Sequence, residues 1–104
     1  MKEITVEELK NMQDNGEDFQ LIDVREQSEY DAANLGGVLI PLKTIPSKKD
    51  EVTKDKKVIV HCRSGKRSAN AIQYLEQFGY DNLYNLKGGI LAYRDEIDDT
   101  LSVS

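Results

Sequence analysis

Short apolar runs alternate with segments of helical periodicity along this chain of 104 residues, and that alternation limits the fold more than any other feature. The clearest run, Val58 to His61, is β-branched and contains no polar alternation, which is typical of a strand buried on both faces. Further strands are predicted at Ile4 (very short), Phe19–Val24, Val38–Ile40 and Asn82–Leu86. Strands separated by helices form a parallel sheet covered on both faces, so the chain is predicted to be of the α/β class.

The segments between these runs predict the helices. Thr5 to Glu8 has the pattern of a capping box, and the helix that follows ends at Asn15-Gly16. The other helices are predicted over residues 26–31, 68–78 and 90–97. Residues 42–54 are polar and contain Pro46, which predicts a loop with room for one helical turn. The tail after Asp98 is expected to fray.

Length and composition narrow the class of protein. The chain is long enough for one domain, predicted over residues 1–104 with a core of about 4–97. A formal net charge of −5 argues against nucleic acid as a partner. One cysteine cannot form an intrachain disulfide, and no apolar run approaches the roughly 20 residues of a membrane helix. We therefore expect a cytoplasmic monomer that binds neither nucleic acid nor a membrane.

The only cysteine, Cys62, ends the strongest strand and opens a loop that leads into a helix. Helix N-termini and nearby cations lower the pKa of a thiol, and only the thiolate is a good nucleophile. A loop of small residues can also turn its N–H groups inward and form a nest for an anion. The predicted substrate-binding residues of this loop are Arg63, Ser64, Gly65, Lys66 and Arg67. Taken alone, a cysteine at a strand end is most often a small buried hydrophobe, but three cations in the next five positions favour a nucleophile.

The neighbouring histidine does not suggest a Cys–His pair. His61 precedes Cys62 in a strand, where successive side chains point to opposite faces, so it is predicted to pack in the core. One cysteine and one histidine are too few for a typical zinc site, and we predict neither a metal nor another cofactor. Lys66 follows a glycine, but Val60 and Arg67 occupy positions where a phosphate-binding loop needs Gly and Ser or Thr.

Three segments, in this order, resemble the single-domain rhodaneses, a family of sulfurtransferases. They are LIDVREQSEY, VIVHCRSGKRS and LKGGILAY, and the resemblance extends from about Ile4 to Ile97. It implies a rhodanese-like single domain, with a five-stranded, mostly parallel sheet and helices on both faces. It also implies that Cys62 takes a sulfane sulfur from thiosulfate or a persulfide and passes it to cyanide or a thiol. Arg63 and Arg67 match the arginines of the family's loop, and Asp23 and Arg25 match residues that brace it.

The chain departs from the family pattern at three positions. Asn34 and Gly36 stand where the family often has His and Pro, and Tyr93 stands where Trp is common. These positions look structural, so the substitutions bear on local rigidity.

Other functions stay open. A persulfide carrier that serves one protein partner would use the same residues as a sulfurtransferase. A cysteine-based phosphatase or arsenate reductase is a further alternative, but phosphatases place five residues between Cys and Arg, and only four separate Cys62 from Arg67. A purely binding module would not need the intact cysteine.

Overall fold

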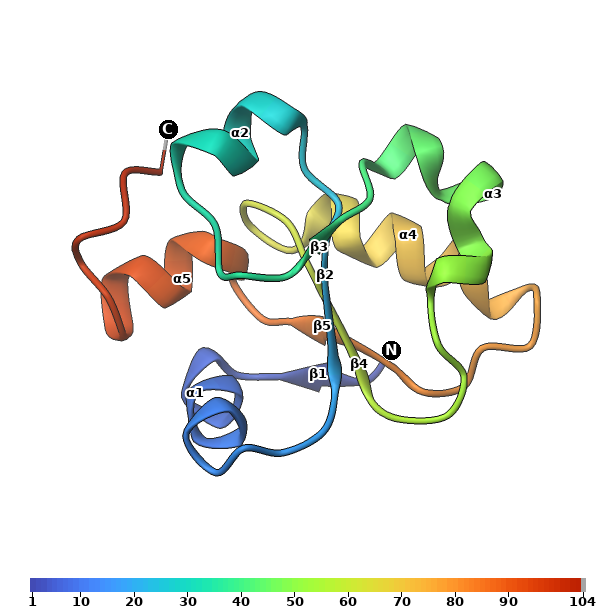
Figure 1. Ribbon diagram of the computed structural model, residues 1–104, viewed down its shortest axis with the longest axis horizontal. Helices are drawn as coiled ribbons and strands as arrows, with labels where there is room; N and C mark the ends of the chain where they lie inside the picture. The colour runs from blue at the N-terminus through green and yellow to red at the C-terminus, as the bar shows by residue number, and fades with distance from the viewer. Residues whose placement is uncertain (104) are drawn as a thin grey trace.

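The protein is built around a five-stranded sheet in which every pair of neighbouring strands is parallel. The structure, a computed structural model, describes residues 1–103 (Figure 1). The strands are β1 (Glu3–Ile4), β2 (Gln20–Asp23), β3 (Val38–Leu39), β4 (Val58–His61) and β5 (Leu83–Leu86). Their order across the sheet is β1-β5-β4-β2-β3, which places the apolar strand β4 at the centre. The predicted α/β class and five-stranded sheet are confirmed.

Helices and short 3-10 turns connect the strands. They are α1 (Val6–Asp14), α2 (Gln27–Ala32), η1 (Leu42–Thr44), α3 (Ile45–Lys48), η2 (Lys49–Glu51), α4 (Lys66–Glu76) and α5 (Gly89–Glu96). The predicted capping box of α1 is confirmed, since the Glu8 amide donates to Thr5 Oγ1 and the Thr5 amide donates to Glu8 Oε1, both at 3.1 Å. These two bonds satisfy amides that the first turn of a helix leaves unpaired.

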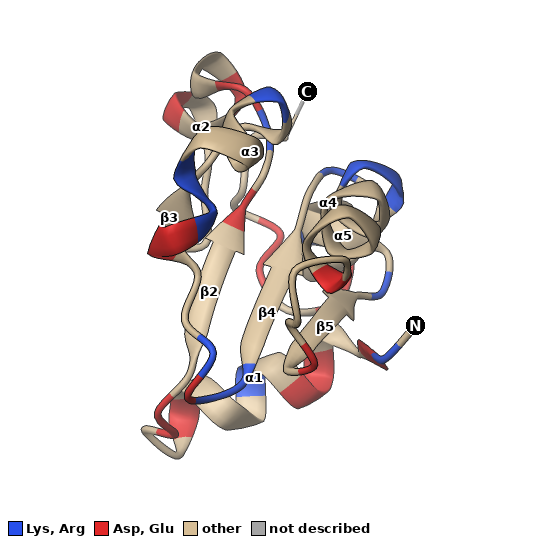
Figure 2. Ribbon diagram, turned by 90° about the vertical axis from the view of Figure 1, so that its right-hand side faces the viewer, with Lys and Arg blue, Asp and Glu red and all other residues tan. Residues whose placement is uncertain are grey.

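Two apolar clusters cover the two faces of the sheet. One joins α3 and α4 to alternate residues of β4, including Ile45, Ile72 and Val60. The other joins α1 and α5 to the opposite side of the same strand through Leu9, Ile59 and Tyr93. Figure 2 shows that β2, β4 and β5 carry almost no charge along their length. Burial on both faces explains why β4 reads as a continuous apolar run.

For residues 42–54 a loop with one helical turn was predicted. That prediction was wrong, because three short helical segments lie between Leu42 and Glu51. Two apolar residues that sequence reasoning placed in a loop, Ile45 and Val52, are buried in the core. Pro46 lies in the first turn of α3, where no intrahelical N–H partner is needed. The hydroxyl of Tyr80 also donates to the Lys49 carbonyl at 2.6 Å and ties this segment to the body.

Several other bounds differ from the prediction by one or two residues, and the start of α4 is the difference that matters for the loop. Helix α4 begins at Lys66 rather than at Ser68, because Gly65 turns the chain with a left-handed φ of 108°. In the part of the tail that the structure describes, up to residue 103, Leu101 packs against the cluster formed by α1 and α5.

The departures from the family pattern have clear structural roles. Asn34 donates to the Tyr30 carbonyl at 3.1 Å and accepts from the Gly36 amide at 2.9 Å, which holds the turn between α2 and β3. The hydroxyl of Tyr93 donates to Gln13 Oε1 at 2.9 Å and links α5 to α1.

Among residues 1–103, no helix combines the length and apolarity needed to cross a bilayer.

Replacing Tyr93 with Phe should destabilise the protein by about 1 kcal/mol, because Gln13 loses its partner while the packing of the ring is kept. Urea denaturation of the wild type and the variant measures this free energy of unfolding. Tyr74→Phe is the matched control, since no hydrogen bond of the Tyr74 hydroxyl occurs among the described residues. Equal losses in both variants would contradict the assigned role of the Tyr93 hydroxyl.

Candidate active site

The candidate site lies at the carboxyl end of β4, where Cys62 follows the strand and a tight loop leads into α4. Ligand sites of open parallel sheets lie at this edge of the sheet. The Cys62 side chain is only 1% exposed, although Arg63, Ser64 and Lys66 next to it lie at the surface. The sulfur therefore sits at the bottom of the loop, beneath residues that reach the solvent.

Backbone amides converge on the sulfur. The Gly65 amide donates to Cys62 Sγ at 3.1 Å and the Ser68 amide donates to it at 3.4 Å. The Ser68 hydroxyl oxygen lies 3.4 Å from the same atom. This arrangement is an anion nest, because several N–H dipoles point their positive ends at one atom.

Two carbonyls of the loop are held on its outside, while its amides face the sulfur. The first amides of α5 bind both, as Ile90 donates to the Cys62 carbonyl at 3.0 Å and Leu91 donates to the Arg63 carbonyl at 3.1 Å. Gly89 is required for this approach, since a Cβ at its position would lie 2.7 Å from the Cys62 oxygen. The segment LKGGILAY thus supports the loop through backbone contact rather than through a catalytic side chain.

The pKa of Cys62 lies below the ordinary value of a thiol. Burial raises this pKa, but hydrogen bonds from the Ser68 hydroxyl and from the amides of Ser68, Gly65 and Ser64 lower it by more. Hydrogen bonds donated to the sulfur are stronger when it is charged, so they favour the thiolate. At a given pH the site therefore holds more of its sulfur as the nucleophilic thiolate than an ordinary thiol does.

Arg67 does not stand alone in the loop, as its guanidinium forms two hydrogen bonds with Glu29 of α2, at 2.8 and 2.9 Å. The hydrogen bond from Arg67 holds the pKa of Glu29 at about 2, and Glu29 raises the pKa of Arg67 in turn. The pair fastens the start of α4 to α2 and balances much of the charge of Arg67. Sequence reasoning missed this role of Glu29, although the residue lies within the segment LIDVREQSEY.

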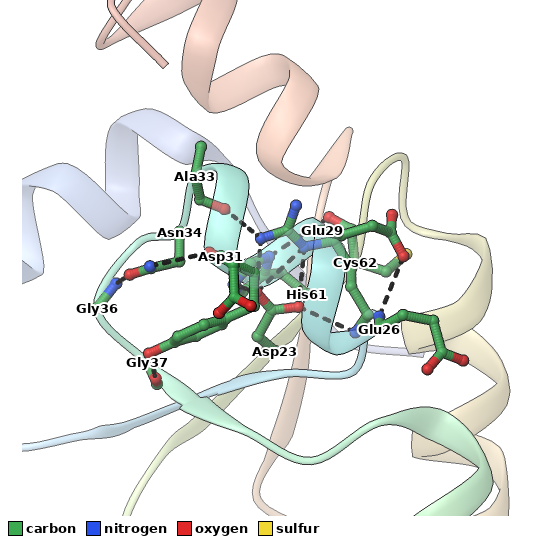
Figure 3. Close-up of polar contacts among 12 residues, drawn as sticks. Asp23, Glu26, Glu29, Asp31, Ala33, Asn34, Gly36, Gly37, His61 and Cys62 are labelled. Atoms are coloured by element: carbon green, nitrogen blue, oxygen red, sulfur yellow. Dashed lines mark hydrogen bonds and ion pairs between the residues drawn. The ribbon is translucent and has the colours of Figure 1, made fainter. Parts of the chain in front are cut away.

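A second ionic cluster, formed by Asp23, Arg25 and His61, is buried below the loop. Arg25 donates from Nη2 to Asp23 Oδ2 at 2.8 Å and to the Ala33 carbonyl at 2.7 Å. Asp23 and His61 face each other because their strands pair in register, and His61 Nε2 lies 3.7 Å from Asp23 Oδ2 (Figure 3). This cluster joins β2, β4 and the turn after α2.

His61 is a core residue. Burial lowers the pKa of His61 more than Asp23 raises it, so the ring is neutral near pH 7. Its two ring nitrogens lie beside Asp23 and beside the backbone oxygen of Cys62. The geometry thus assigns His61 to the support of β4 rather than to a Cys–His pair.

Among the described residues, no group of three His, Cys, Asp or Glu side chains could hold a metal ion.

Comparison with known proteins shows the family of the chain. Residues 5–96 match the family described as Rhodanese-like domain. The chain belongs to the rhodanese-like domain family. A "Sulfurtransferase" of Allochromatium vinosum is 38% identical to this rhodanese-like domain over 94 residues, which cover 89% of the chain and 88% of that protein.

Two other relatives extend the comparison. The crystal structure of a rhodanese-like domain protein from Staphylococcus aureus is 35% identical, with a TM-score of 0.83 and coverage of 100% of this chain and 99% of that one. A "Putative sulfur carrier protein YrkF" of Bacillus subtilis is 32% identical over 89 residues, covering 85% of this chain and 48% of that protein.

Glu29→Gln should lower the free energy of unfolding at pH 7 by about 1 kcal/mol, a modest value because Arg67 is partly in water. The pKa of Glu29 is lowered to about 2 from 4.5, so the contribution is present above pH 4.5 and lost as the pH falls toward 2. The variant should therefore lose less stability than the wild type between these pH values, as measured by urea denaturation. Glu17→Gln, which removes an exposed pair with Lys57, is the control and should have little effect.

The rate of Cys62 alkylation by iodoacetamide should rise with pH to a midpoint below the free-thiol value of about 8.5. The reason is that the inward amides bind the thiolate more strongly than the thiol. Since the chain has one cysteine, intact mass reports this reaction without ambiguity. A midpoint at or above that of a free cysteine peptide would contradict the effect assigned to the nest.

Proposed function

We propose that this rhodanese-like domain is a sulfurtransferase that moves a sulfane sulfur from thiosulfate or a persulfide donor to a thiophilic acceptor through a persulfide on Cys62. The single observation that carries the proposal is that the Gly65 and Ser68 amides both donate to the only sulfur of a cysteine in the chain. The names of the relatives add support, because they include a sulfurtransferase of nearly the same length. The chemistry needs a reduced cysteine, which suits the cytoplasm.

In the first step the Cys62 thiolate attacks the outer sulfur of thiosulfate. A new S–S bond forms, the bond between the two thiosulfate sulfurs breaks, and sulfite leaves with the electron pair. Arg63 and Lys66 lie at the exposed side of the loop, so their charges can attract the dianion and ease the departure of sulfite. Arg67, which binds Glu29, keeps the loop closed beside them.

In the second step the acceptor attacks the outer sulfur of the Cys62 persulfide. Cyanide would leave as thiocyanate, and a thiol would leave as a new persulfide, while Cys62 returns to the thiolate. The inward amides suit both anionic states, since they stabilise negative charge on either sulfur. No second cysteine exists in the chain to resolve the persulfide as an internal disulfide. The exchange should follow ping-pong kinetics.

A persulfide carrier for one protein partner is the second candidate, favoured by the relative named as a putative sulfur carrier protein. The two roles differ in the acceptor, so turnover with cyanide or a small thiol separates them from transfer to candidate proteins alone. Phosphatase chemistry is less well supported. Gly65 and Ser68 donate to the sulfur itself, and a loop with four residues between Cys62 and Arg67 makes a small nest for a phosphate ester.

Incubation with thiosulfate should add the mass of one sulfur atom to the protein, and cyanide should then remove it. Intact mass spectrometry measures both steps. Cys62→Ser is the control and should show neither, because a serine hydroxyl is far less readily ionised. The Cys62 protein should leave an aryl phosphate unhydrolysed under the same conditions.

If thiosulfate adds no mass, a small persulfide is the second donor to test. Failure of both donors to load Cys62 would refute the sulfurtransferase assignment. Brisk hydrolysis of the aryl phosphate that is lost in Cys62→Ser would favour the phosphatase alternative.

A further inference from the structure

A buried hydrogen-bond chain connects the sulfur to the neighbouring strand β5. The Ser68 hydroxyl lies 2.6 Å from Asn85 Oδ1 and 3.4 Å from Cys62 Sγ. Asn85 is 5% exposed and Ser68 is fully buried, so no bulk water competes for these groups. Asn85 reaches the loop because it pairs in register with Val60, which lies on the same face of β4 as Cys62.

The orientation of the Asn85 amide is fixed by its second contact. Asn85 Nδ2 donates to the Gly65 carbonyl at 3.0 Å. The reversed amide would bring its oxygen against the Gly65 carbonyl oxygen, which is repulsive. Asn85 must therefore present Oδ1 to Ser68, and this oxygen can only accept a hydrogen bond.

The Ser68 hydroxyl has one proton and two possible acceptors. The short distance to Asn85 places that proton on the side of the amide. The lone pairs of Ser68 Oγ then face the sulfur, where they can accept from the S–H of the thiol. A thiolate has no such proton, so the hydroxyl must rotate toward the sulfur in order to stabilise it.

We propose that Asn85 is a positioning residue that holds the Ser68 hydroxyl proton away from Cys62 until the sulfur becomes anionic. On ionisation the thiol proton leaves to water, and the hydroxyl rotates about its Cβ–Oγ bond, so that its hydrogen bond passes from Asn85 to the sulfur. No O–H bond breaks. This inference rests on the proposed function, because sulfur transfer requires an anionic sulfur at Cys62.

Asn85 thus has two opposite effects on the sulfur. By accepting from Ser68 it opposes the thiolate, because ionisation costs one buried hydrogen bond. By donating to the Gly65 carbonyl it favours the thiolate, because it helps to hold in place the residue whose own amide donates to Cys62. The two effects can be separated, since only the first requires the hydroxyl of Ser68.

The charged and titratable groups near the loop are the same in the wild type and in variants of Ser68 and Asn85. Three cations belong to the loop and the start of α4, one carboxylate belongs to α2, and the buried ionic cluster lies below. These groups are Asp23, Arg25, Glu29, His61, Arg63, Lys66 and Arg67. Because none is changed, a difference between the variants reports the Ser68–Asn85 contact.

The experiment measures the pH midpoint of Cys62 alkylation in four proteins: the wild type, Asn85→Leu, Ser68→Ala and the double variant. Leu has the branched shape of Asn, although it is larger, and its side chain can neither donate nor accept a hydrogen bond. We expect Asn85→Leu to lower the midpoint by about 0.5–1 pH unit when Ser68 is present, the equivalent of one net hydrogen bond. In the Ser68→Ala background the same change should not lower it. The test is the difference between the two backgrounds, because the contact of Asn85 with Gly65 is lost in both. A shift on Asn85→Leu that is equal in both backgrounds, or that is upward relative to the Ser68→Ala background when Ser68 is present, would overturn the proposal.

A second measurement needs no change at Asn85, so it decides the matter even when Asn85→Leu fails to fold. The side-chain amide signals of Asn85, followed by NMR in the wild type, should shift with pH at the midpoint of Cys62 alkylation. In Ser68→Ala this shift should collapse. Absence of the shift in the wild type, or an undiminished shift in Ser68→Ala, would contradict the proposed route. Neither measurement uses sulfur transfer, so failure here is distinct from failure of the proposed function.

Discussion

The site depends on one backbone constraint: the carbonyls of the loop after β4 are bound from outside, so that its amides are left facing Cys62. The first turn of α5 takes the carbonyls of Cys62 and Arg63, and β5 takes that of Gly65 through Asn85. An amide and the carbonyl of the same peptide point in opposite directions. The bond from Leu91 to the Arg63 carbonyl therefore turns the Ser64 amide of the same peptide toward Cys62, and the bonds to the Cys62 and Gly65 carbonyls hold the residues on either side. The nest is formed before any ligand arrives.

This constraint changes the source of the electrostatic effect on the sulfur. Three cations close to the cysteine in sequence suggest that side-chain charge activates it. In the structure, hydrogen bonds from Ser68, Gly65 and Ser64 oppose the effect of burial on the pKa of Cys62, while Arg67 is bound by Glu29. Fixed dipoles in a buried site act at short range and are screened little by salt. Exposed charges such as Lys66 are better suited to attracting an anionic donor than to holding the sulfur.

Much of the fold could be predicted because its signals are local. Strand β4 has the predicted bounds, and the capping box of α1 has both of its predicted hydrogen bonds, since each depends on residues only a few positions apart. The segment from Leu42 to Glu51 was misjudged for the opposite reason. Its helical turns are stabilised by burial of Ile45 against the sheet and by a bond from Tyr80, and neither contact can be seen in a polar local sequence.

For the candidate site, the sequence by itself determined the chemistry that is available: one thiol at the end of a buried strand, a tight loop and a helix start. Residue type and short spacing are enough for that conclusion. Only the tertiary structure decided which groups surround the thiol. Glu29 meets Arg67 across 38 positions, and Ser68 meets Asn85 across 17. Such pairs form because the carboxyl ends of parallel strands, and the helices that follow them, lie side by side at one edge of the sheet. That arrangement exists only once the core has packed.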